Sequence, residues 1–271
     1  MLKRTIVSLL LIPLLFYVAL GAPKIVLTVF VGAFSAIAVY ELLYNTKLVL
    51  HARMIVYTMI AAFFVPLWCH FGCSRPAALI GILLFYMALF GELMLAHTKI
   101  PFAPAALCMA AGIVIPYMFS ALTRILIMDS GRYFIMLPFV VAFSSDIGAY
   151  FAGVTLGKHK LCPIISPKKT VEGLIGGLLF AAFVTAVYGL ILQVCFGFKV
   201  NYFFVVIYAL VGALGGVFGD LSFSVIKRQT GIKDYGYLFP GHGGILDRFD
   251  SVIVTAPMIE AMLLLLPMAV K

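Results

Sequence analysis

Acidic side chains in the C-terminal half of the sequence draw attention because so little of the chain is charged. Only 11% of the 271 residues are Asp, Glu, Lys or Arg, whereas a soluble domain has roughly 25%. Asp220 lies inside a long apolar run, where an ionisable residue costs about 2.5–3.5 kcal/mol and is usually paired or functional. Helical spacing puts Asp220, Ser224 and Lys227 on one face. This face is either an Asp–Lys pair reaching the membrane interface or part of a cation site in a wet cavity.

A second acidic pair lies in the run GHGGILDRFD, residues 241–250. Asp247 and Asp250 are three residues apart, so they share a face at the start of a predicted helix, where the helix dipole favours negative charge. Gly243 and Gly244 allow a ligand to approach the backbone N–H groups. Two carboxylates beside such N–H groups suit a Mg²⁺–phosphate complex. The alternative is a tight turn capped by one Asp.

Lysines gather in the segment GKHKLCPIISPKKTVEGLIGG, residues 157–177, ahead of another predicted helix. Ser166 or Thr170 is suited to cap this helix. Lys168 and Lys169 would then flank a helix N-terminus, which is an anion-binding arrangement. The same lysines would also suit a loop resting on anionic lipid headgroups. Both interpretations bring phosphate groups to this loop.

A further acid, Asp146, lies in SSDIGAYFAG, residues 144–153, within another apolar run. Gly148 and Gly153 lie in this run, where small residues allow close helix packing. Asp146 is either a partner for a basic residue or a substrate contact, and we favour the substrate contact. His242 is a candidate phosphate donor or general acid–base. Together, these acids and bases predict a site for a metal-bound phosphate compound at membrane depth, and hence a lipid substrate.

Apolar segments of membrane-spanning length must position these residues. They cover approximately 5–22, 25–46, 54–70, 77–96, 102–122, 133–155, 173–197, 202–226 and 249–269. Helices are expected, because in the bilayer core backbone N–H and C=O groups find hydrogen-bond partners only within helices or closed barrels. The alternation of polar and apolar residues that is typical of barrel strands is absent. We therefore predict an all-α, polytopic integral membrane helical bundle with about nine transmembrane helices, the first retained rather than cleaved as a signal peptide. An apolar N-terminal half, 1–125, and a C-terminal half carrying the chemistry, 126–271, are expected to form one bundle.

The net charge of +9 is interpreted as the positive-inside bias of a membrane protein rather than as a nucleic-acid surface. With a cytoplasmic N-terminus, 13 of the 19 Lys and Arg residues lie inside. The six outside are Lys24, Arg75, Arg124, Arg132, Lys199 and Lys271. We therefore predict a multi-pass protein of the cell (inner) membrane whose active site faces the cytoplasm. Small residues in the spans permit a homodimer.

The run from Ser224 to Asp250, SVIKRQTGIKDYGYLFPGHGGILDRFD, resembles the signature of the phosphatidate cytidylyltransferase family. The matching positions are Ser224, Lys227, Arg228, Lys233, Asp234, Pro240, His242, Gly243, Gly244, Asp247, Arg248 and Asp250. The stretches SDIGAYFAG and SPKKTVEG also resemble that family, so the resemblance covers about 144–250. It implies a nucleotidyltransferase that converts CTP and phosphatidate into CDP-diacylglycerol and pyrophosphate in phospholipid biosynthesis, with a requirement for Mg²⁺.

Residue roles follow from this resemblance together with the chemistry of the side chains. We expect Asp220, Asp247 and Asp250 to hold Mg²⁺, with Asp146 as a substrate or further metal contact. Basic side chains are expected to steady the phosphates: Lys168, Lys169, Lys227, Arg228 and Arg248. The remaining predicted substrate contacts are Ser166, Thr170, Ser224, Gly243 and Gly244. A phosphate monoester is already anionic at neutral pH, so we expect His242 to position a phosphate.

Two other classes of protein fit the sequence less well. A transporter or channel would also use intramembrane acids, but transporters often have two related halves, and here the polar residues crowd one half. A CDP-alcohol phosphotransferase is another lipid enzyme, but its D-G-x-x-A-R run is absent from the sequence.

Overall fold

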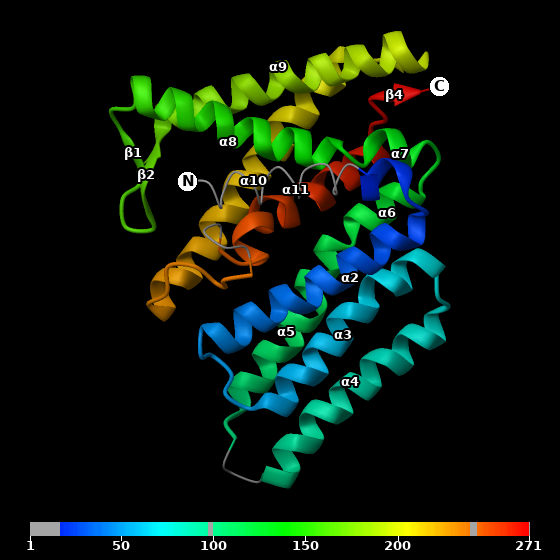
Figure 1. Ribbon diagram of the computed structural model, residues 1–271, viewed down its shortest axis with the longest axis vertical. Helices are drawn as coiled ribbons and strands as arrows, with labels where there is room; N and C mark the ends of the chain where they lie inside the picture. Colours follow the sequence, from blue (N-terminus) through cyan, green and yellow to red (C-terminus); the bar gives the residue numbers. More distant parts are fainter. Residues whose placement is uncertain (1–16, 97–99, 239–242, 271) are drawn as a thin grey trace. The chain divides into compact units, whose positions relative to one another are not determined.

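The computed structural model describes residues 17–96, 100–238 and 243–270. These residues are helical apart from four short strands and the connecting loops (Figure 1). The chain divides into two compact units. The first comprises Met1–Asp129 with Gln229–Phe249, and the second comprises Ser130–Arg228 with Asp250–Lys271.

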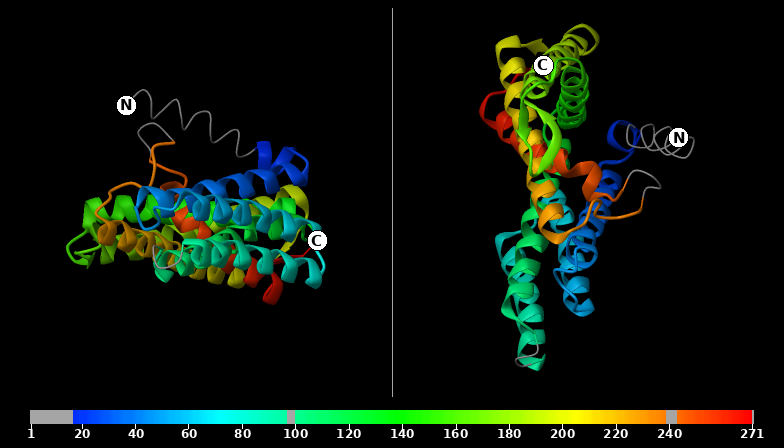
Figure 2. Two further views of the ribbon diagram at one scale, coloured as in Figure 1. Left: turned by 90° about the horizontal axis from the view of Figure 1, so that it is seen from below. Right: turned by 90° about the vertical axis from the view of Figure 1, so that its left-hand side faces the viewer.

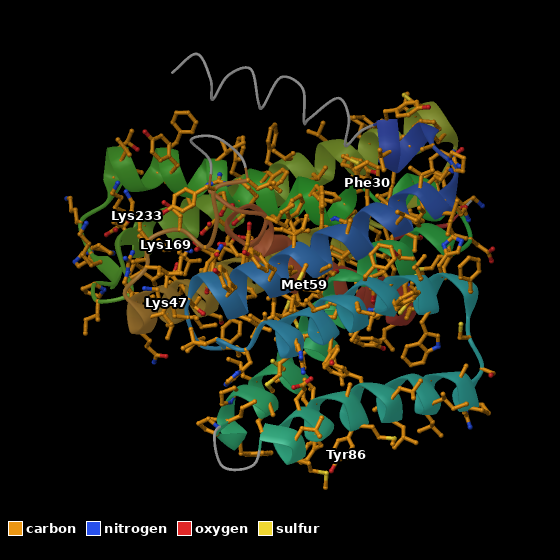
Figure 3. All side chains as sticks on the ribbon, turned by 60° about the horizontal axis from the view of Figure 1, so that its bottom comes forward. Phe30, Lys47, Met59, Tyr86, Lys169 and Lys233 are labelled. Atoms are coloured by element: carbon orange, nitrogen blue, oxygen red, sulfur yellow. The ribbon has the colours of Figure 1, made fainter. Side chains whose placement is uncertain are left out.

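The helices of the first unit form a bundle. In chain order they are η1 (Tyr17–Gly21), α2 (Lys24–Tyr40), η2 (Glu41–Asn45), α3 (Ala52–Phe71), α4 (Arg75–Ala96), α5 (Phe102–Phe119) and α6 (Ala121–Ile127), where η marks a π-helix. Helices α2, α3 and α5 pack against one another, and α4 lies against α3 and α5 (Figure 1, Figure 2). Gly32 of α2 allows this approach, because a Cβ there would lie 2.8 Å from the carbonyl oxygen of Phe63. Large apolar side chains of α4 are exposed, including Tyr86, which projects away from the bundle (Figure 3). Such a surface is suited to contact with lipid.

The second unit contains the longer helices and all four strands. Its elements are α7 (Gly131–Phe134), α8 (Leu137–Leu156), β1 (Lys160–Cys162), β2 (Ser166–Thr170), α9 (Val171–Phe196), β3 (Lys199–Val200), α10 (Tyr202–Thr230), α11 (Leu246–Leu265) and β4 (Ala269–Val270). Helix α11 starts within the residues of the first unit and continues in the second. Strands β3 and β4 pair antiparallel near the end of the chain.

Small residues allow the helices of the second unit to pack closely, as predicted for the run around Asp146. A Cβ on Gly148 of α8 would lie 2.5 Å from the Cβ of Phe180 on α9, and a Cβ on Gly176 would lie 2.2 Å from the Cβ of Ala152. A second seam joins α10 and α11, where the hydroxyl of Thr255 donates to the carbonyl oxygen of Gly212 at 3.0 Å. Small residues at helix interfaces are typical of membrane proteins.

Seven helical segments of the described residues are long and apolar enough to cross a membrane. They are Lys24–Asn45, Ala52–Phe71, Arg75–Ala96, Phe102–Ile127, Gly131–Leu156, Val171–Phe196 and Tyr202–Thr230. The prediction of an all-α polytopic membrane protein is confirmed, but the predicted count of about nine is not. Most of the first predicted segment, 5–22, lies outside the described residues. Helix α11 forms where the last segment was expected, but its 20 residues include four charged ones and it is not among the seven.

The segment between α8 and α9, expected to be a loop, forms a two-stranded hairpin. Strands β1 and β2 run antiparallel, with Lys160 opposite Thr170 and Cys162 opposite Ser166. The hairpin projects from adjacent ends of α8 and α9 (Figure 1). At its base, Nδ1 of His159 lies 2.6 Å from Oε1 of Glu172, which ties the chain before β1 to the first turn of α9.

Candidate active site

An ion pair joins two charged residues of the second unit. The ammonium nitrogen of Lys169 on β2 lies 2.6 Å from Oδ2 of Asp220 on α10. One turn later on α10, the Ser224 hydroxyl donates to Oδ1 of Asp220 at 3.1 Å. The predicted common face of Asp220 and Ser224 is therefore confirmed. The basic group at 2.6 Å is supplied by the hairpin (Lys169 is labelled in Figure 3), whereas the sequence pointed to Lys227 on the same helix.

Two more carboxylates interact electrostatically with the Lys169–Asp220 pair. Asp146 on α8 interacts electrostatically with Asp220 and Lys169. Asp250 on α11 interacts with Asp220, Asp146 and Lys227, and it is only 8% exposed. A Cβ on Gly219 would lie 2.6 Å from the carbonyl oxygen of Asp250, so α10 and α11 approach closely here. These groups number three acids and two amines, so negative charge is in excess by one when all are ionised.

The hairpin that presents Lys169 is held at both of its ends. The hydroxyl of Thr170 accepts from the backbone N–H of Gly173 at 3.1 Å and so caps α9. Nε of Arg228, in the last turn of α10, donates to the carbonyl oxygen of Ile165 at 3.1 Å. Of the two caps considered from the sequence, Thr170 is the one observed. Ser166 does not cap α9, because it lies in β2 and pairs with Cys162.

In the first unit, backbone N–H groups of residues before α11 bind the carboxylate of Asp247. Oδ2 of Asp247 accepts from the backbone N–H groups of Tyr235 at 2.7 Å and Gly244 at 3.1 Å. Gly243 has a φ of +85°, a backbone conformation that glycine adopts readily. A turn capped by Asp therefore accounts for this carboxylate oxygen. Arg248 is exposed, and His242 lies outside the described residues.

Sequence reasoning missed the role of Glu41. This residue is 3% exposed, and both its oxygens bind the start of α11. Oε1 accepts from the N–H of Ile245 at 3.0 Å, and Oε2 accepts from the N–H of Leu246 at 2.9 Å. One sequence signal indicates that the partner of Glu41 is not on its own helix. The residues three and four positions to either side of Glu41 include no Lys or Arg.

The donor atoms of the second unit fit Mg²⁺ in chemical type and charge. Mg²⁺ prefers oxygen ligands and is usually held by one or two carboxylates with phosphate oxygens and water. The excess negative charge around Asp220, Asp146 and Asp250 would favour a cation. Among the described residues, however, no group of three or more His, Cys, Asp or Glu side chains is arranged to hold a metal ion. Mg²⁺ and its ligands therefore stay a prediction.

Comparison with known proteins gives consistent relatives. The family model described as the Cytidylyltransferase family matches residues 2–266. The phosphatidate cytidylyltransferase of Staphylococcus saprophyticus is 38% identical over 173 residues, which cover 63% of this chain and 64% of that protein. The phosphatidate cytidylyltransferase of Staphylococcus aureus is 39% identical over the same shares. This chain thus spans 64% of the length of these curated relatives. Because the family model covers nearly all of it, the chain belongs to the cytidylyltransferase family.

Proposed function

We propose that the protein transfers the cytidylyl group of CTP to phosphatidate, forming CDP-diacylglycerol and pyrophosphate for phospholipid biosynthesis. Membership of the cytidylyltransferase family and the names of the relatives support a nucleotidyltransferase. The observation that carries the proposal is the Lys169–Asp220 pair, with Asp146 and Asp250 close enough to act on it electrostatically. Charged groups of both signs on apolar helices suit a substrate that joins a phosphate to a lipid.

The reaction needs charge control more than proton transfer. A phosphate oxygen of phosphatidate attacks the α-phosphorus of CTP and forms the new P–O bond. The bond from the α-phosphorus to the oxygen that bridges to the β-phosphorus breaks, and pyrophosphate leaves with that electron pair. Because the attacking phosphate is anionic at neutral pH, no strong base is required. His242 accordingly serves to position a phosphate in this proposal.

Basic side chains would bind and orient the phosphates of CTP. Lys169 lies on β2 beside Asp220, and in this role it would exchange that contact for a phosphate oxygen. Lys168 on the same strand and Arg228 at the end of α10 are exposed, so they are accessible to a triphosphate. The guanidinium groups of Arg228 and Arg248 also suit two-point contact with phosphate. Lys227 would complete the balance of charge against the acids.

Carboxylates of the second unit would hold Mg²⁺. Asp220 and Asp250 are the proposed ligands on structural and chemical grounds, with Asp146 as a further contact, and Asp247 is kept as a ligand on the sequence alone. When bound, Mg²⁺ would neutralise phosphate charge and stabilise the pyrophosphate leaving group. The hydroxyls of Ser224 and Thr170 would bind a substrate in addition to their present hydrogen-bond partners. Ser166, Gly243 and Gly244 are proposed phosphate contacts.

We further propose that the protein lies in the cell membrane with a cytoplasmic N-terminus and a site that faces the cytoplasm. Tyr237 is 88% exposed in the run before α11, so a Tyr237→Cys variant without the five native cysteines tests the orientation. An impermeant maleimide should label it in inverted vesicles and leave it unlabelled in intact cells. Labelling in intact cells would reverse the orientation. A homodimer and the division into halves 1–125 and 126–271 stay predictions; the mass of the detergent-solubilised protein tests the dimer.

The position of the transferred label tests the reaction itself. Purified protein is incubated with phosphatidate and CTP that carries ³²P at either the α- or the γ-phosphorus. Label from the α-position should enter chloroform-soluble lipid, whereas label from the γ-position should stay in the aqueous phase as pyrophosphate. Chelation of Mg²⁺ should stop the transfer. Lipid labelled from the γ-position would indicate a kinase, and the absence of lipid label from either position would exclude the proposed reaction.

A further inference from the structure

The carboxylate of Glu41 is buried at the start of α11. Glu41 begins η2, within a segment apolar enough to span a membrane. Its two oxygens accept from consecutive backbone N–H groups, those of Ile245 and Leu246, which are more than 200 residues away in the chain. Hydrogen bonds to an ionised acceptor are stronger than those between neutral groups. This residue therefore holds the backbone at the start of α11.

Two glycines make room for this carboxylate. A Cβ on Gly236 would lie 2.3 Å from Oε1 of Glu41, and a Cβ on Gly244 would lie 2.2 Å from the same atom. Real Cβ atoms do not approach an oxygen so closely. Any other residue at either position would therefore displace the Glu41 side chain or the backbone at that position. Gly236 and Gly244 are therefore both packed against the Glu41 carboxylate.

A second side chain of the same π-helix binds the backbone of Tyr235. Nδ2 of Asn45, four residues after Glu41, donates to the carbonyl oxygen of Tyr235 at 2.5 Å. The N–H of Tyr235 donates to Asp247, and the ring of Tyr235 is fully buried. Residues 235–236 and 244–247 are thus bound together by η2 and by Asp247.

We propose that Glu41 is a positioning residue for cytidylyl transfer, acting through the backbone at the start of α11. The N–H groups that it holds immediately precede Asp247 and Arg248, which are predicted to bind metal and phosphate. Glu41 itself would touch neither substrate. This inference rests on the proposed function, because its effect is expressed in the turnover of that reaction.

A purely structural role would have a different signature from a positioning role. If Glu41 only stabilised the fold, its replacement would lower the unfolding temperature, and the folded fraction would turn over normally. If it positions the start of α11, the folded variant would turn over slowly. Residues that orient groups in contact with a metal or substrate typically contribute about 10- to 100-fold to activity.

The first experiment measures kcat and KM for Glu41→Gln as monodisperse protein in detergent, beside the wild type. The glutamine keeps one oxygen but presents an NH₂ group to one of the two N–H donors. We expect kcat to fall about 10- to 100-fold, and KM for CTP to change by less than about threefold because binding is largely preserved. The matched control is Glu92→Gln. Glu92 is also an acid in an apolar span, but it contacts Tyr57 and Arg53, and its replacement should leave kcat unchanged.

The second experiment displaces Glu41 without replacing it. Gly236→Ala puts a methyl group where Oε1 lies, whereas a Cβ on Gly91 would meet nothing within 4 Å, so Gly91→Ala is its control. Gly236→Ala should lower kcat to a similar degree. In the double variant the two effects should be much less than additive in free energy, because residues acting as one unit are strongly coupled.

Each outcome decides the inference. Wild-type kcat in folded Glu41→Gln overturns it, as do fully additive effects in the double variant. If Glu41→Gln does not fold, Gly236→Ala alone decides, and a wild-type kcat for it overturns the inference. Loss of folding in both variants would assign Glu41 a structural role only. An inactive wild-type protein in the same assay would instead count against the proposed function.

Discussion

In the second unit, Asp220 faces the ammonium group of Lys169 at 2.6 Å, whereas in the first unit Glu41 and Asp247 accept hydrogen bonds from the backbone. The difference matters for function. A side-chain ion pair can exchange its partner for a phosphate or a metal by a change of rotamer. A carboxylate that binds backbone N–H groups cannot leave them without moving the chain or stranding buried donors. Asp220 is therefore suited to bind a ligand, whereas Glu41, and Asp247 through its Oδ2, hold the backbone before and at the start of α11.

The largest expected effect distinguishes a carboxylate in a side-chain ion pair from a carboxylate that binds backbone N–H groups. Asp220→Asn and Asp247→Asn should each lower kcat by about 1,000-fold, since several kcal/mol of electrostatic stabilisation would be lost. Only Asp247→Asn should also reduce stability, by about 1.5–3 kcal/mol, because it weakens hydrogen bonds from two backbone N–H groups to a charged acceptor. Initial rates and thermal unfolding in detergent measure the two quantities. Equal losses of stability in both variants would remove the distinction between the two units.

A smaller effect is expected at the basic partner. Lys169→Met keeps the length and the apolar part of the side chain but removes the charge near Asp220. KM for CTP should rise about 10- to 100-fold, which corresponds to one hydrogen bond to a charged group. Lys47→Met, at an exposed lysine of the first unit (Figure 3), is the control and should leave KM unchanged. An unchanged KM for Lys169→Met would remove this lysine from the nucleotide site.

The smallest effect is expected at the base of the hairpin. Glu172 is paired with His159, whose side chain is 79% exposed, and exposed ion pairs contribute about 0–1 kcal/mol. Glu172→Gln should therefore change KM for CTP by less than about twofold. A large rise in KM would show that the base of the hairpin controls how Lys169 is presented.

Local features of this fold follow directly from the sequence. The apolar runs predict the spanning helices to within a few residues, because hydrophobicity over about 20 residues is a strong signal. The helical period places Ser224 one turn from Asp220, and their hydrogen bond confirms it. The small residues around Gly148 predict close helix packing, and the structure shows this packing against α9. Each of these predictions rests on the residues of one segment alone.

Features that join distant segments were not predictable in this way. Nothing in the sequence around Glu41 indicates that its acceptors serve N–H groups at positions 245 and 246. The pairing of Lys169 with Asp220 likewise depends on the hairpin, whose strands are only three and five residues long and lack a clear alternation of polar and apolar residues. Sequence patterns can indicate that an acid in a span needs a partner, but the partner is chosen by tertiary packing.

The most direct test of the account is the single-turnover rate of cytidylyl transfer, because it isolates chemistry from binding. Wild-type protein and Asp220→Asn are each used in excess over α-labelled CTP, with saturating phosphatidate, and labelled lipid is followed with time. The account predicts CDP-diacylglycerol from the wild type and a rate constant about 1,000-fold lower for the folded variant. Transfer by Asp220→Asn at a rate near that of the wild type would contradict the assignment of the chemistry to this centre.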